Sequence, residues 1–160
     1  IRLILLSFPM RLSYVLGFSN LVRSVKYSMF EIDFSNESFD IIWAEGSISI
    51  IGFENGLKIW RRFLKPNVFL VVHDDIKNIT NKRKQIPNYG YNIKGYFSLP
   101  QDAWWINYYS PIENKIQELR KKYIDDSEAL KILNEKQNEI EMFKKNPKSH
   151  GSVFFIMEKI

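Results

Sequence analysis

The feature that most constrains the fold is a short apolar run that ends in polar residues, at positions 38–47 (SFDIIWAEGS). A turn-forming stretch at 35–38 precedes the apolar residues 39–44. A short, continuous apolar run of this kind predicts a fully buried parallel strand. Residues 45–47, Glu-Gly-Ser, follow at the strand's end, and ligands of open α/β sheets bind beyond the carboxyl ends of strands. The stretch therefore predicts a strand that delivers polar groups to a pocket.

The composition of the 160 residues excludes several classes of protein and of site. A hydrophobic fraction of 45% argues against a disordered chain. The chain contains no cysteine and only two histidines, His73 and His150, so we expect no disulfide, no thiolate nucleophile and no metal site. The net charge of +5 permits an anionic ligand, but the basic residues are scattered in pairs and triplets, which is typical of solvated helix faces.

Residues 1–16 are an unusual beginning for a domain. Arg2 and Arg11 interrupt the apolar stretch, Pro9 breaks it, and no small-residue cleavage site follows, so it does not read as a signal segment. The stretch is also too short and too charged to span a membrane. We interpret it as an atypical or truncated front end of a single domain over residues 1–160, and we expect no membrane partner.

Apolar runs and periodic stripes predict strands that alternate with helices along the rest of the chain. This alternation predicts an α/β fold with a mostly parallel sheet that is covered on both faces. The predicted strands are residues 2–6, 22–29, 39–44, 68–73, 91–99 and 153–157.

Three predicted helices follow from spacing and capping signals, besides short ones at 12–16 and within 77–84. One apolar stripe, with a proline after Lys65 to end the helix, comprises Phe53, Leu57, Trp60 and Leu64. The sequence Ser-Pro-Ile-Glu at 110–113 combines a capping box with proline at the first helical position, so a helix is expected from there to about Tyr123. Asp125 or Asp126 is expected to cap the next helix.

Four stretches, in their order along the chain, resemble the class I S-adenosylmethionine-dependent methyltransferases of the small-molecule type. They are residues 28–47, 52–74, 99–113 and 151–159, of which 39–46 (FDIIWAEG) and 56–67 (GLKIWRRFLKPN) are the most specific. The likeness covers about residue 17 to the end. It implies a Rossmann-like three-layer sandwich whose last strand is antiparallel, and the run VFFIM suits that strand.

The sequence departs from the family pattern in the N-terminal part, which the resemblance therefore describes as incomplete. The family's first strand and its Gly-rich turn have no counterpart, since no Gly-x-Gly-x-Gly occurs in the chain. If residues 2–6 are the second strand, Ser7 replaces the acidic residue that holds the ribose hydroxyls. Loss of such a charged partner costs about 1.5–3 kcal/mol, so weakened cofactor binding is expected. A smaller departure is Val68, where the family commonly has glycine.

The resemblance implies S-adenosylmethionine as the cofactor and assigns residues to it. Glu45 and Gly46, at the end of the fourth family strand, would lie beside the methyl donor, where Glu45 could also orient the acceptor or its proton. Ser28, Met29 and Phe30 follow the third strand, where the family contacts the adenine ring. The structural alternatives are a solvated strand end for the first pair and ordinary core packing for the others.

His73 ends the next predicted strand and is a candidate general base, because an unperturbed histidine titrates near neutral pH. The alternative is a histidine that only forms hydrogen bonds. Asp74 and Asp75 are expected to be solvated or helix-capping.

The densest aromatic group is a candidate lid over a small organic acceptor, because Trp and Tyr combine large apolar faces with a polar group. Packing of this segment onto the sheet is the alternative. The group comprises Trp104, Trp105, Tyr108 and Tyr109, whose spacing would place Trp104 with Tyr108 and Trp105 with Tyr109 on a helix.

Three functions remain open from the sequence. The first is methyl transfer to a small-molecule acceptor in the cytoplasm, by a chain that could form a homodimer. The second is a non-catalytic remnant or interaction domain, which the missing Gly-rich turn favours. The third, a nucleic-acid methyltransferase, ranks last because it rests on net charge alone and the Asn/Asp-Pro-Pro-aromatic signature is absent.

Overall fold

The computed structural model describes residues 3–6, 27–100, 102–147 and 151–160 of the chain. The chain divides into two compact units. Unit 1 comprises Ile1–Phe97 together with Val153–Ile160, and unit 2 comprises Ser98–Ser152.

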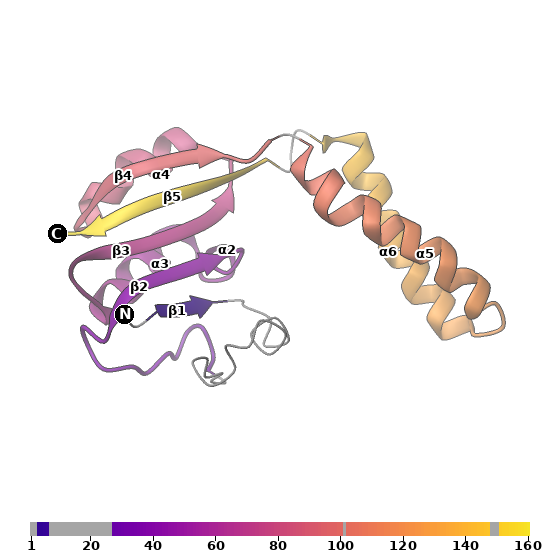
Figure 1. Cartoon of the computed structure of the whole chain (residues 1–160), viewed down its shortest axis with the longest axis horizontal. Coiled ribbons are helices and arrows are strands. Elements are labelled where there is room, and N and C mark those ends of the chain that lie inside the picture. Colours follow the sequence, from indigo (N-terminus) through magenta and orange to yellow (C-terminus); the bar gives the residue numbers. More distant parts are fainter. Residues whose placement is uncertain (1–2, 7–26, 101, 148–150) are drawn as a thin grey trace. The chain divides into compact units, whose positions relative to one another are not determined.

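Unit 1 is built on a mixed sheet with the strand order β1-β2-β3-β5-β4 (Figure 1). Its first three strands are parallel, with Leu3 paired to Ile41 and Ile42 paired to Leu70. In Figure 1, β5 runs opposite to its neighbours, so the α/β sheet is mostly parallel with an antiparallel last strand, as predicted. The strands are β1 (Leu3–Leu6), β2 (Phe39–Glu45), β3 (Leu64–Asp75), β4 (Tyr91–Ser98) and β5 (Ser152–Lys159).

The position of β1 corrects the assignment of residues 2–6 to the second family strand. β1 pairs directly with β2, which the resemblance identifies as the fourth strand. In a doubly wound sheet the first strand lies beside the fourth. β1 therefore occupies the place of the first strand, although the sequence contains no Gly-rich turn. Ser7, proposed to replace the ribose-binding carboxylate, and the predicted helix at 12–16 lie outside the described residues.

The helices of unit 1 are short. In the part of the unit that the structure describes, they are α2 (Ile48–Ile51), α3 (Phe53–Trp60), α4 (Ile79–Gln85) and the 3₁₀ turns η1 (Arg61–Phe63) and η2 (Ile86–Tyr89). The expected helix from Phe53 to Leu64 is too long, because α3 ends at Trp60 and Leu64 already begins β3. Leu64 fits the helical spacing by chance, since a single buried leucine satisfies a helical and an extended pattern equally well.

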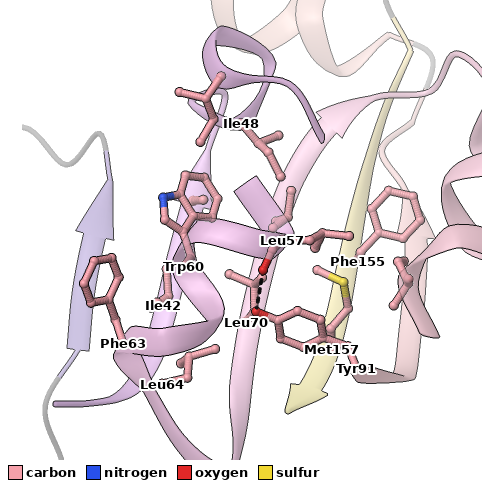
Figure 2. Packing of buried hydrophobic residues seen from close by; sticks show 14 of the residues in the cluster. Ile42, Ile48, Leu57, Trp60, Phe63, Leu64, Leu70, Tyr91, Phe155 and Met157 are labelled. Carbon is pink, nitrogen blue, oxygen red and sulfur yellow. Dashed lines mark hydrogen bonds between the residues drawn. The ribbon is translucent and has the colours of Figure 1, made fainter. Parts of the chain in front are cut away.

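The core of unit 1 lies between one face of the sheet and helices α2 and α3 (Figure 2). Alternate strand residues such as Ile42, Leu70 and Phe155 are at most 1% exposed, as expected when successive side chains point to opposite faces. Trp60 lies among them at 1% exposure, and the Tyr91 hydroxyl donates a hydrogen bond of 3.2 Å to the Leu57 carbonyl. This core fixes the register of the strands and thereby the position of their carboxyl ends.

Unit 2 contains two long helices, α5 (Ser110–Lys122) and α6 (Ser127–Lys145). The Asp126 carboxylate caps α6 by accepting a hydrogen bond of 2.9 Å from the Ala129 amide, which confirms one of the two predicted caps. The predicted capping box at Ser110 is wrong. A π-helical segment, η3 (Trp105–Tyr109), runs directly into α5, and Ser110 itself has helical angles, φ −63° and ψ −46°.

Pro111 explains why the helical backbone directly before α5 forms a π-helix, which is wider than an α-helix. Inside an α-helix, Pro111 would lack one amide donor and its ring would clash with the carbonyl four residues earlier. The π-helical turn over Trp105–Tyr109 changes the local hydrogen-bond spacing directly before it. Glu113, expected in the capping box, instead accepts hydrogen bonds from Lys144 at 2.6 Å and Gln137 at 3.0 Å.

Candidate functional site

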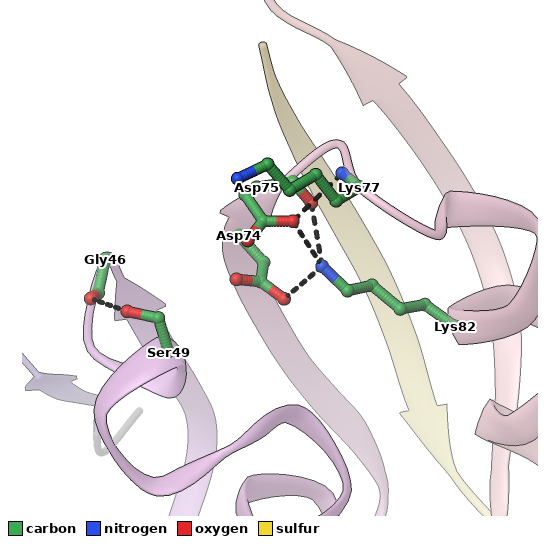
Figure 3. Close-up of polar contacts among 6 residues, drawn as sticks. All are labelled: Gly46, Ser49, Asp74, Asp75, Lys77 and Lys82. Carbon is green, nitrogen blue, oxygen red and sulfur yellow. Dashed lines mark hydrogen bonds and ion pairs between the residues drawn. The ribbon is translucent and has the colours of Figure 1, made fainter. Parts of the chain in front are cut away.

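The carboxyl end of β2 is an open polar corner. Glu45 is exposed at the end of the strand, and Gly46 turns the chain with φ of +66°. A Cβ atom added to Gly46 would meet no atom of the described residues within 4 Å, so none of these residues covers the backbone here. Ser49 Oγ donates to the Gly46 carbonyl at 3.0 Å, as Figure 3 shows. The hydroxyl of Ser47 is buried and has no hydrogen-bond partner among the described residues.

His73 lies in register with Glu45 on the neighbouring strand. Its side chain is 9% exposed, and its ring packs on Phe154 with 4.7 Å between ring centroids. Burial lowers the pKa of His73 below the ordinary value of 6.5, while the negative charges of Glu45 and Asp74 oppose this shift. The imidazole is therefore neutral at neutral pH and able to accept a proton.

Lys82 of α4 closes the carboxyl end of β3, as Figure 3 shows. Its ammonium contacts Asp74 Oδ2 at 2.8 Å, Asp75 Oδ1 at 2.9 Å and the Asp75 carbonyl at 2.8 Å. The side chains of Asp74 and Lys82 are only 5% and 14% exposed. Asp74 is thus a buried ion-pair partner, which corrects the expectation that it is solvated or helix-capping.

Asp75 is the exposed member of this group and shapes the turn that follows β3. Its Oδ1 also accepts a hydrogen bond of 2.9 Å from the Lys77 amide. Partial burial would raise the pKa of Asp75, but the hydrogen bond and charge of Lys82 outweigh it and the pKa is lowered. Sequence reasoning missed Lys82. The available signal was strand alternation, which places Asp74 on the same face as the core residues Leu70 and Val72 and so requires a nearby cation.

The predicted adenine-contacting residues lie at a turn, in which Met29 and Phe30 take part. The strand expected at 22–29 is wrong at residues 27–29, which are not extended in a sheet, and its first part lies outside the described residues. Ser28 Oγ accepts a hydrogen bond of 3.3 Å from the Phe30 amide. Met29 packs against the core of unit 1, whereas Phe30 is 65% exposed. Of these residues, Phe30 presents the accessible aromatic surface.

The predicted acceptor-binding aromatics lie in unit 2, where they pack on one another. Trp104 meets Tyr108 edge to face at 5.8 Å, which confirms their predicted pairing. The Trp104 indole donates a hydrogen bond of 2.7 Å to Ser152 Oγ. Trp105 and Tyr109 both pack on Phe143, with centroid distances of 6.3 and 4.3 Å. Packing therefore accounts for much of this cluster.

The two tyrosines differ in their surroundings. Tyr109 is 7% exposed, and burial, together with the nearby Glu139, raises its pKa. Tyr108 is 37% exposed, and Lys136 donates a hydrogen bond of 3.3 Å to its hydroxyl. Tyr108 thus has the more accessible ring of the two.

The described residues contain no group of His, Asp and Glu side chains arranged to hold a metal ion. Over the same part of the chain, no helix combines the length and the apolar character needed to cross a bilayer.

Comparison by sequence gives no match: neither a protein-family model nor a curated protein matches this chain. Comparison with solved structures gives many matches. A SAM-dependent methyltransferase from Thiobacillus denitrificans in complex with S-adenosyl-L-homocysteine matches with a TM-score of 0.73 and 14% identity, over 94% of this chain and 69% of that chain. The corresponding complex from Geobacter sulfurreducens matches with a TM-score of 0.73 and 12% identity, over 92% and 68%.

A third similar structure carries a different activity in its name, the cyclase SpnF. It matches with a TM-score of 0.68 and 12% identity over 94% of this chain, which spans 61% of the cyclase chain. At these identities the likeness concerns the fold. The chain has the fold of the class I S-adenosylmethionine-dependent methyltransferases.

Proposed function

We propose that the chain transfers a methyl group from S-adenosylmethionine to a small-molecule acceptor at the carboxyl ends of β2 and β3. The observation that carries the proposal is that Glu45, Gly46 and His73 meet at this edge of a methyltransferase fold. Ligands of open α/β sheets bind at the carboxyl ends of the strands. Two of the similar structures are complexes with S-adenosyl-L-homocysteine, the demethylated form of this cofactor.

The described residues fit part of a cofactor site. None of the described residues covers Gly46, so a ligand can approach its backbone closely. The exposed carboxylate of Glu45 can accept hydrogen bonds from a ligand's ammonium or hydroxyl groups. Phe30 offers an accessible ring for an adenine base. The missing Gly-rich turn removes backbone contacts to the methionine part, so we expect weaker binding than in a complete site.

The proposed roles follow from charge and protonation. When bound, S-adenosylmethionine supplies a methyl carbon that its sulfonium has already activated, so the protein mainly binds, aligns and desolvates the reactants. The neutral ring of His73 can accept the proton that the acceptor loses. Glu45 can orient the acceptor through a charged hydrogen bond. Trp104, Trp105, Tyr108 and Tyr109 are proposed to contact the acceptor, with Tyr108 the most accessible of them.

Calorimetric titration of the folded protein with S-adenosylmethionine and with S-adenosylhomocysteine tests the proposal. We expect saturable binding that weakens about tenfold in Glu45→Gln, since a charged hydrogen-bond partner is lost. Glu118→Gln, which changes an exposed glutamate in unit 2, is the matched control and should bind as the wild type does. No heat up to millimolar ligand would refute the proposal.

The alternative is a non-catalytic remnant or interaction domain that retains the fold. The absence of a Gly-x-Gly-x-Gly sequence favours it, and the cyclase illustrates that this fold also serves other chemistry. A folded chain that binds neither ligand would support this alternative.

The proposal also includes a cytoplasmic location and allows a homodimer. A chain without cysteine suits a reducing compartment, since it needs no disulfide. Cell fractionation tests the location, and sedimentation velocity at several concentrations tests the oligomeric state.

A further inference from the structure

Unit 2 contains a pocket of about 560 Å³. The proposed methyl transfer assigns no ligand to this pocket. Its volume lies within the range of about 300–1,000 Å³ that is usual for sites of small organic ligands. The lining residues are Asp102, Trp105, Phe143, Lys144 and Pro147. The indole, the phenyl ring and the proline provide apolar walls, so the two charged residues decide which ligands are preferred.

The positive charge in the lining is already compensated. Lys144 Nζ contacts Glu113 Oε1 at 2.6 Å and Glu141 Oε1 at 3.3 Å. Asp102, in contrast, is exposed, and its carboxylate forms no ion pair or hydrogen bond with any residue that the structure describes. Among the lining residues that the structure describes, the uncompensated charge is therefore negative, which favours a cationic ligand.

The backbone adds to this preference. Phe143 and Lys144 belong to the last turn of α6, which ends at Lys145, and Pro147 lies just beyond it. The carbonyls at the C-terminal end of a helix carry partial negative charge, which favours cations, and here the Phe143 carbonyl also accepts a hydrogen bond of 3.1 Å from the Asn146 amide. The indole of Trp105 already has one ammonium over its face, that of Lys144 at 5.3 Å from the ring centroid. The ring is therefore available to a ligand as apolar surface, and the face under the Lys144 ammonium is already occupied.

We propose that this pocket binds an apolar organic ammonium ion, with the ammonium at Asp102 and the hydrocarbon against Trp105 and Phe143. The inference goes beyond the proposed methyl transfer, because it concerns unit 2 by itself.

Three probes of nearly the same shape and different charge test the inference on the whole chain. They are 2-phenylethylammonium, 2-phenylethanol and 3-phenylpropionate, titrated at pH 7 while amide and indole NMR signals are recorded. We expect the ammonium probe to shift the Trp105 indole signal in a saturable manner, the alcohol to bind at least several-fold more weakly, and the carboxylate most weakly. Equal or tighter binding of the carboxylate or the alcohol would overturn the inference, and so would the absence of binding by all three.

Variants of the pocket provide the second arm. Asp102→Asn removes the charge and should weaken binding of 2-phenylethylammonium about tenfold. Asp125→Asn, an exposed acid in the turn before α6, is the matched control and should leave binding unchanged. Equal affinity in wild type and Asp102→Asn would overturn the inference. S-adenosylhomocysteine is titrated separately, so failure of the cofactor site and failure of this pocket are distinguishable.

Discussion

At the carboxyl end of β2 the backbone turns at Gly46, where none of the described residues covers it, whereas at the end of β3 three contacts from Lys82 close the turn. Glu45 and His73 are register partners, so these two differently built ends lie next to each other. This contrast distinguishes the strand end that a ligand can approach from the strand end that Lys82 holds in place. A ligand can approach the backbone at the end of β2, whereas the contacts of Lys82 fix the backbone at the end of β3.

The largest expected effect comes from opening the closed end. Lys82→Met keeps the length of the side chain but leaves the carboxylate of Asp74 buried without a cation, which should lower the free energy of unfolding by about 3–5 kcal/mol. Urea denaturation measures the change. Lys65→Met is the control, because its ion pair with Asp40 is 46% and 27% exposed and should contribute at most about 1 kcal/mol. Equal losses in the two variants would contradict a special role for Lys82.

A smaller effect is expected from the open end. Gly46→Ala forces a side chain into the left-handed region, which costs about 1–2 kcal/mol, and adds no clash. Gly90→Ala, at φ of +75°, has the same strain, but its Cβ would lie 2.5 Å from Arg61 Nε. Arg61 would then lose its hydrogen bonds to the carbonyls of Gly90 and Ile160. Thermal unfolding should therefore show the larger loss for Gly90→Ala, and the reverse order would refute the openness of the β2 end.

The two serines of the β2 end should respond in opposite directions. Ser47→Ala removes a buried hydroxyl without a partner among the described residues and should raise the free energy of unfolding by about 1 kcal/mol. Ser49→Ala removes the hydrogen bond to the Gly46 carbonyl and should lower it by about 0.5–1 kcal/mol. Chemical denaturation of both variants decides the matter, and a destabilised Ser47→Ala protein would mean that this hydroxyl does have a partner.

The smallest expected effect is the pH dependence due to His73, because Glu45 and Asp74 partly cancel the effect of burial. A lowered pKa in the folded state means that the unfolded chain binds the proton more readily. The stabilising contribution is therefore complete above the ordinary value of 6.5 and is lost as the pH falls below it. The urea concentration at the midpoint of unfolding should fall between pH 7.5 and pH 5.5 in the wild type. It should fall less in His73→Asn.

His150→Asn is the control for this comparison, because it removes the only other histidine of the chain. It should retain the pH dependence of the wild type. Identical pH dependence in the wild type and both variants would show that His73 does not have a lowered pKa.

Much of the sheet could be predicted from the sequence, because the hydrophobic runs that form buried strands are local. The runs at 39–44, 68–73 and 153–157 are strands in the structure. Errors arose where a local pattern has two solutions. Leu64 fits the spacing of a helix as well as that of a strand, and it begins β3. Ser110 does not cap α5, because the π-helical turn directly before it continues into the helix.

The candidate site was less predictable than the fold. Glu45, Gly46 and His73 could be found because they follow buried strands, where polar residues stand out. The ion pair of Asp74 with Lys82 links β3 to a helix, and its partner could not be chosen from sequence among Lys82, Arg83 and Lys84. The packing of the aromatic cluster on Phe143 also depends on how α6 returns along α5, which a linear pattern does not specify.

A cofactor is proposed to bind at the carboxyl ends of β2 and β3. The most direct test is to record amide NMR spectra of the isotope-labelled chain during titration with S-adenosylhomocysteine. We expect saturable shifts at Glu45, Gly46 and Ser47 and at residues 73–75, with little change at the far ends of the same strands. Shifts elsewhere alone, or none at millimolar ligand in a folded protein, would contradict it.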